Sequence, residues 1–182
     1  ASGISEKVES NSSVWRVSRA RLPWLLIGML GGILSAQVIS KFEGNISHLP
    51  ALAFFIPLIT AMGGNVGTQS AALLIRGFAT GKFDLSNVPS FIYKELRVGL
   101  LMGTVYGFFA GLVGTIFMTD YNFYLGLVVF ISMVGGMMTA AVLGVIAPSL
   151  LKRLNIDPAI ASGPFVTTLN DITGILIYML IA

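Results

Sequence analysis

The chain of 182 residues has no cysteine, only one histidine and few charged residues. Without cysteine, disulfide bonds and thiolate metal sites are excluded. Charged residues make up 10% of the chain and hydrophobic residues 55%. Soluble domains carry about a quarter charged residues, so the composition excludes that class and indicates an integral membrane protein. The net charge of +3 lies in short loops, and we expect no nucleic-acid partner.

Five apolar runs are each long enough, or nearly so, to cross a bilayer. A helix needs about 20 residues to cross roughly 30 Å of hydrocarbon. The alternating pattern of membrane β-strands is absent. We therefore predict an all-α integral membrane protein with five transmembrane helices, over Leu22–Ser40, Pro50–Ile75, Val98–Met118, Tyr121–Leu151 and Pro158–Ala182.

The basic residues predict how these helices are oriented. Ten of the eleven Lys and Arg residues lie on one side of the predicted membrane. Only Lys41 lies in a loop on the other side. Since short cytoplasmic loops carry the excess of Lys and Arg, the amino terminus is predicted inside and the carboxy terminus outside. We expect a multi-pass protein of the inner (plasma) membrane.

The first 20 residues are polar and begin with Ala-Ser-Gly rather than Met. We interpret residues 1–20 as an expression remnant and linker, with a cytoplasmic region expected upstream, and residues 21–182 as the transmembrane domain. Val14–Arg21 is either a basic interfacial helix or a frayed tail. The single histidine, His48, lies near Glu43 in an outer loop, and we expect it to be solvated.

Small residues recur at helical spacing and predict close packing. One set lies in the first run and another in the third: Gly28, Gly31, Gly32 and Ser35, then Gly99, Gly103, Gly107 and Gly111. The fourth run is longer than one straight crossing, so we expect it to tilt, to bend near its Gly135-Gly136 pair, or to stop at Pro148.

The second run is interrupted by Pro57 and by the stretch GGNVGTQS, from Gly63 to Ser70. Adjacent glycines weaken or bend a helix, so we expect an irregular span here. Asn65 and Gln69 are four residues apart and share a face. They either clamp two helices together or line a polar path.

The last run carries a carboxylate, Asp171, about 20 Å from its start at Pro158. No Lys or Arg lies inside another run to neutralise it, and a charge at this depth costs from a few to more than ten kcal/mol. Gly163, Thr167 and Asp171 are spaced by four, and Gly174 and Tyr178 continue that face. Pro164 lacks an N–H, which makes carbonyls on this face available.

Three things can compensate Asp171: protonation, hydrogen bonds from a neighbouring helix, or a cation from outside the chain. With no cysteine and no histidine inside a predicted span, the ligands available to a cation there are oxygen atoms, which suit Mg²⁺, Ca²⁺ or Mn²⁺ better than Zn²⁺ or Cu²⁺. Mg²⁺ keeps several waters and takes one or two carboxylates. Two Asp171 carboxylates across the axis of a symmetric dimer would hold a hydrated ion.

Two long stretches, Pro57–Gly77 and Asp157–Tyr178, resemble the MgtE family of magnesium channels and transporters. The resemblance covers Val14–Ala182. It implies a homodimer in the lipid bilayer, with a pore on the dimer axis lined by the second and fifth helices. It implies Mg²⁺ as the transported ion, with Mn²⁺, Co²⁺ or Ca²⁺ as alternatives.

The resemblance also implies site residues. Asp171 corresponds to the pore carboxylate, and the backbone carbonyls of Thr167 and Gly163 to its partners as metal ligands. Some members have Asn at the position of Gly163. The residues expected to line the pore are Gly63, Gly64, Asn65, Gln69 and Asn170. Typical members also have cytoplasmic regulatory domains, which residues 1–20 are too short to hold; Val14–Arg21 resembles only the end of the connecting plug helix.

The sequence thus predicts a Mg²⁺ channel domain that passes the partly hydrated ion down its electrochemical gradient. Two alternatives stay open: a proton-coupled secondary transporter, and a non-conducting packing subunit of a membrane complex. An enzyme is not expected, because no second titratable group lies at depth beside Asp171 in the predicted spans.

Overall fold

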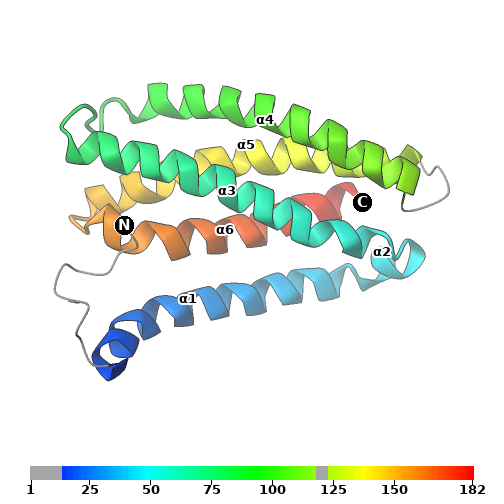
Figure 1. Ribbon diagram of the computed structural model, residues 1–182, viewed down its shortest axis with the longest axis horizontal. Helices are drawn as coiled ribbons and strands as arrows, with labels where there is room; N and C mark the ends of the chain where they lie inside the picture. The colour runs from blue at the N-terminus through cyan, green and yellow to red at the C-terminus, as the bar shows by residue number, and fades with distance from the viewer. Residues whose placement is uncertain (1–13, 118–122) are drawn as a thin grey trace.

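The computed structural model describes residues 14–117 and 123–182, and all of their regular structure is helical. A short helix, α2 (Glu43–His48), joins the first two of the long ones. The long helices lie side by side (Figure 1): α1 (Val14–Lys41), α3 (Leu52–Ala79), α4 (Val88–Phe117), α5 (Phe123–Arg153) and α6 (Pro158–Ile181). The predicted all-α fold is confirmed. Residues 1–13 of the predicted linker, and 118–122, lie outside the described part.

Among the described residues, three helices are long and apolar enough to cross a membrane by length and composition. They are Val88–Ile116 in α4, Phe123–Arg153 in α5 and Gly163–Ile181 in α6. The apolar part of α1 is shorter, Leu25–Lys41. The chain is a membrane protein with several spans, as its composition predicts.

Aromatic contacts define the two ends of the bundle. Lys152 Nζ lies 3.7 Å from the centre of the Phe78 ring, so the loops after α3 and α5 lie at one end. At the other end, the Tyr124 hydroxyl donates to the carbonyl of Ala182 over 2.8 Å. We call the first the basic end, because it carries Arg76, Lys82, Lys94, Arg97, Lys152 and Arg153. Successive long helices run in alternating directions between the two ends (Figure 1).

The predicted glycine stripe of α4 is confirmed as a packing surface. It lies directly on the backbone of α5: a Cβ added at Gly103 would stand 2.7 Å from the Cα of Val134, and one at Gly111 2.6 Å from the carbonyl oxygen of Gly126. Without side chains at these positions, the two helices approach to near backbone contact. As a result α5 is the most enclosed helix, with Val129, Met133 and Met137 almost fully buried.

The predicted irregularity of the second span is wrong. α3 is α-helical at every position from Leu52 to Ala79, including Gly63–Ser70. Its glycines allow close approach: Gly67 lies against the backbone of α5 at Ala140 and Gly144. α5 likewise continues as one helix through Gly135-Gly136 and the buried Pro148, so it does not stop at that proline.

The small residues of α1 are confirmed as a packing face only in part. Gly31 packs against the Thr168 side chain of α6, and Ser35 is buried. Gly28 and Gly32 face open space, with nothing within 4 Å of an added Cβ. The helix begins at Val14, so Val14–Arg21 continues into the first span without a break.

Candidate functional site on the open strip of α6

Helix α6 packs on α1, α3 and α5. In Figure 1 it lies between α1 and α3. Thr168 contacts α1 at Gly31, and Asn170 contacts α3 at Gly63. With 3.6 residues per turn, the positions between these two contacts form a strip along one side of the helix. That strip holds Gly163, Thr167 and Asp171, and we call it the α6 strip.

The start of α6 is fixed by its cap. The Asp157 carboxylate accepts a hydrogen bond from the Ala159 amide over 2.9 Å, and Pro158 occupies the first turn, where its missing N–H costs nothing. Pro164 is accommodated inside the helix but gives no N–H to the carbonyl of Ile160. The strip therefore begins beside a backbone carbonyl that lacks its usual helical donor.

The carbonyl of Gly163, a predicted ligand, is in contact with Thr167. The Thr167 hydroxyl donates to the carbonyls of Gly163 and Pro164, each over 3.1 Å. Gly163 itself is exposed and nothing lies within 4 Å of an added Cβ. In the continuous helix each of these carbonyls also accepts the backbone N–H four residues on, so both of its lone pairs are engaged within α6.

Asp171 is half-buried and stands on the strip without a partner. In the ranges 14–117 and 123–182, no hydrogen bond or ion pair joins its carboxylate to the chain. Beyond it the strip closes, because α3 covers the next turns of α6. Gly174 lies under Ile59, and the buried Tyr178 donates to the carbonyl of Leu52 over 2.9 Å. The face predicted from Gly163 to Tyr178 is thus open only as far as Asp171.

The predicted pore-lining residues divide into two groups. Asn65 and Gln69 of α3 are exposed and Gly64 is partly exposed. Gly63 is buried beneath Asn170, which is 1% exposed and donates through Nδ2 to the carbonyl of Thr60 over 3.2 Å. The Oδ1 atom of Asn170 is buried with no hydrogen-bond partner. Burial favours a packing role over a pore-lining role for Gly63 and Asn170.

Within the described ranges, no three His, Asp or Glu side chains gather where a metal ion would fit. The strip of one chain offers a carboxylate, a hydroxyl and backbone carbonyls. These are hard oxygen donors, which suit Mg²⁺, Mn²⁺ and Ca²⁺. One chain alone does not enclose an ion there.

A second buried carboxylate was missed from the sequence. Glu95 is 4% exposed in α4 and accepts a hydrogen bond from the Ser70 hydroxyl of α3 over 2.6 Å. The neighbouring Lys94 and Arg97 made this stretch look like a solvated flank, whereas α4 begins at Val88. Glu95 stands four residues before Gly99, in register with the glycine stripe, and this spacing was the available signal.

Comparisons of the sequence with protein families and with known proteins all identify the same family. The model of the MgtE family, described as a divalent cation transporter, matches residues 56–181. The chain is 40% identical over 163 residues to the magnesium transporter MgtE of Thermus thermophilus, covering 90% of this chain and 36% of that protein. It is 40% identical over 164 residues to the magnesium transporter MgtE of Bacillus subtilis, with 89% and 36% covered. For the Enterococcus faecalis magnesium transporter MgtE, identity is 38% over 174 residues. The chain thus spans little more than a third of these relatives' length.

Proposed function

Because the chain belongs to the MgtE family of divalent cation transporters, we propose that it carries Mg²⁺ across a membrane, past Asp171, between two copies of itself. It is a transporter and not an enzyme. Mn²⁺, Co²⁺ and Ca²⁺ are the alternative ions, since their oxygen-ligand preferences overlap.

One observation carries this proposal: Asp171 is a carboxylate halfway along an apolar helix, on an open strip and without a partner among the described residues of its chain. Such a charge must be compensated. Hydrogen bonds from neighbouring helices, one of the structural explanations, are not made by any described residue. A hydrated divalent cation supplies the missing opposite charge, and the carbonyls of Gly163 and Thr167 line its approach.

A homodimer completes the path. The strip lies on the surface of the single chain, and closing it needs a second surface. In a symmetric dimer the same strip faces itself across the axis, so two Asp171 carboxylates meet one ion. The exposed Asn65 and Gln69 of α3 then stand beside the path. Gly63 and Asn170 hold α3 against α6 behind it.

The direction of transport follows from the basic end. With five crossings and the basic end in the cytoplasm, the amino terminus is inside and the carboxy terminus outside the plasma membrane. A divalent ion then gains about 4.6 kcal/mol per 100 mV of inside-negative potential when it moves inward. Cytoplasmic regulatory domains, where a longer chain supplies them, would act on the basic end.

The proposal is tested by Mg²⁺ uptake into liposomes that contain the purified chain and a Mg²⁺-sensitive dye. We expect Asp171→Asn to reduce uptake at least tenfold, because the amide keeps the shape and removes the charge. Glu43→Gln is the matched control, since it removes an exposed carboxylate on α2 far from the strip. Normal uptake by Asp171→Asn would refute the proposal.

The same liposomes separate a channel from a proton-coupled transporter. Under an imposed inside-negative potential, uptake by a channel rises with the potential and is unchanged by a pH gradient at constant potential. A dependence on the proton gradient would favour the secondary transporter instead.

A further inference from the structure

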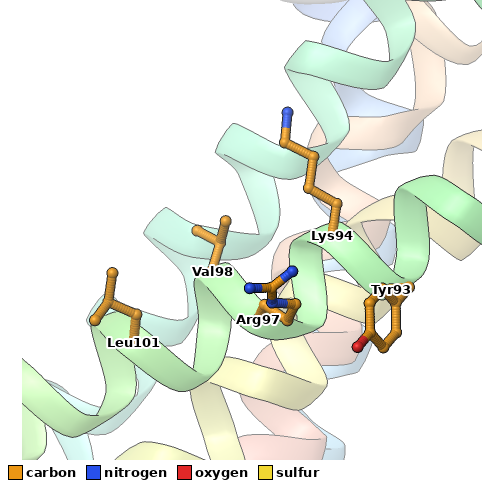
Figure 2. Close-up of a pocket in the computed structure, with 5 residues that line it drawn as sticks. All are labelled: Tyr93, Lys94, Arg97, Val98 and Leu101. Atoms are coloured by element: carbon orange, nitrogen blue, oxygen red, sulfur yellow. The ribbon is translucent and has the colours of Figure 1, made fainter.

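A second surface on the molecule combines positive charge with apolar side chains. It is an open groove of about 450 Å³ on the outer face of α4, lined by Tyr93, Lys94, Arg97, Val98 and Leu101. We call it the α4 groove. In Figure 2 Arg97 lies in its middle, with Tyr93 toward one end and Leu101 toward the other. It is separate from the α6 strip, and the transport proposal makes no use of it.

The groove has a charged half and an apolar half. Lys94 and Arg97 are exposed and three residues apart, so their side chains share a face. Val98 and Leu101 follow on the same face deeper in the span, and Leu101 is 63% exposed. At 1.5 Å per residue, the groove is about 12 Å long along the helix axis. Its charged half is the half nearer to the basic end of the bundle.

No carboxylate of the described residues forms an ion pair with Lys94 or Arg97. Glu95, which lies between them in sequence, is buried and is bound by Ser70 of α3. Arg97 lies over the Tyr93 ring at 5.9 Å, which holds the guanidinium along the surface of the helix. The groove is thus complementary to an anion.

We propose that the α4 groove binds an anionic phospholipid, with its phosphate at Lys94 and Arg97 and its acyl chain along Val98 and Leu101. An exposed aromatic ring and two cations at the end of an apolar helix match the level of lipid headgroups. An aqueous anion would leave the apolar half uncovered. A second copy of the chain docked here through the same face would bring like charges together.

The test places a fluorescent reporter in the groove. Tyr93→Trp is introduced in a Trp15→Phe/Trp24→Phe background, which leaves one tryptophan. The chain is reconstituted in mixed phosphatidylcholine and phosphatidylglycerol, and either lipid is supplied with brominated acyl chains at the same mole fraction. The quenching ratio gives the relative association of the two lipids with the groove.

We expect phosphatidylglycerol to be favoured about 25-fold, since each of the two cations near an anionic headgroup contributes about a fivefold factor. Lys94→Gln/Arg97→Gln should bring the ratio to about one. Lys82→Gln/Arg153→Gln is the matched control: it removes the same charge from the basic end outside the groove and should keep the preference. Circular dichroism checks that both variants are folded, and single Lys94→Gln and Arg97→Gln variants should give intermediate ratios.

Three results would overturn the proposal. A quenching ratio near one in the parent shows that the groove does not select anionic lipid. A polypeptide would then be the remaining partner for the groove. A preference unchanged in Lys94→Gln/Arg97→Gln places the lipid elsewhere. Loss of the preference on adding millimolar inorganic phosphate identifies an aqueous anion site.

Discussion

The two acids Asp171 and Glu95 show how one chemical group takes two roles in one bundle. Glu95 is enclosed between α4 and α3 and accepts from Ser70 at 2.6 Å, so its cost of burial is offset inside the chain. Asp171 is half-buried and unpartnered within the described ranges, so its compensation has to come from outside. The number of partners, more than the depth, separates a structural acid from a candidate ion site.

The Ser70–Glu95 hydrogen bond should behave as a coupled pair. Ser70→Ala leaves a buried carboxylate without its donor, and we expect a loss of about 1.5–3 kcal/mol in the free energy of unfolding. Adding Glu95→Leu, which has no acceptor, to Ser70→Ala should cost less than the sum of the two single changes, because each single change removes the same bond. Unfolding of the four proteins in detergent, followed by circular dichroism, measures the coupling; strictly additive losses would contradict it.

A pH effect is expected in the loop between α3 and α4. The Ser86 hydroxyl and amide donate to the Asp84 carboxylate, at 2.5 and 2.8 Å, and lower the pKa of Asp84 below its ordinary value. A lowered folded pKa gives stability that is present above the unfolded value of about 3.9 and is lost as the pH falls through the folded value.

Asp84→Asn should therefore melt at a lower temperature than the parent at neutral pH, and the difference should disappear as the pH falls below the lowered folded pKa of Asp84. Because Asp84 is exposed, the difference should be small. Melting curves of both proteins across the pH range check it, with the exposed Glu43→Gln as a control that has no such hydrogen bonds. A difference that persists at low pH would assign the effect to packing.

At the scale of the helices, glycine serves close approach and not flexibility. The stretch from Gly63 to Ser70 was expected to disturb a helix, yet α3 is continuous there. The reason is the neighbour: Gly63 makes room for Asn170, and Gly67 for the backbone of α5. A sequence shows where glycine provides no side chain, but it does not show which neighbouring residue occupies that space.

A glycine-to-alanine pair tests this view. A Cβ at Gly103 would stand 2.7 Å from the Cα of Val134, so we expect Gly103→Ala to destabilise by about 1–3 kcal/mol. Gly32→Ala meets nothing within 4 Å and should be neutral or stabilising by up to about 1 kcal/mol. Thermal unfolding in detergent compares the two; equal effects would contradict the role of the α4 stripe.

Much of the architecture could be predicted from apolar length and spacing alone. Each predicted span overlaps a long helix, and the glycine stripe of α4 lies against α5. The partner of each face could not be predicted. Asn170 and Asp171 are neighbours in sequence, but they lie about 100° apart around the helix. Asn170 therefore contacts α3, whereas Asp171 lies on the open strip. The burial of Glu95 could not be predicted, because its basic neighbours are typical of an exposed segment. The ion contacts of Gly163, Thr167 and Asp171 stay predictions.

At the scale of the whole molecule, the α6 strip is a surface feature of one chain and becomes an interior path only if something covers it. The donors on the strip are too few to enclose an ion. A second copy would double the carboxylates and close the path on one axis. The α4 groove lies on a different helix and faces outward. In such a dimer, lipid would contact the outer surface and the α6 strip would lie at the centre.

This arrangement can be tested by thiol crosslinking, because the chain has no cysteine of its own. Gly163→Cys places a single thiol on the strip, at a position with open space around it. If two strips face each other, a short bifunctional thiol reagent should join two chains in the membrane, and the product should run as a dimer on a denaturing gel. Leu100→Cys, on the exposed side of α4, is the control and should stay monomeric. Crosslinking of Leu100→Cys without crosslinking of Gly163→Cys would place the dimer interface on α4 and remove Asp171 from its axis.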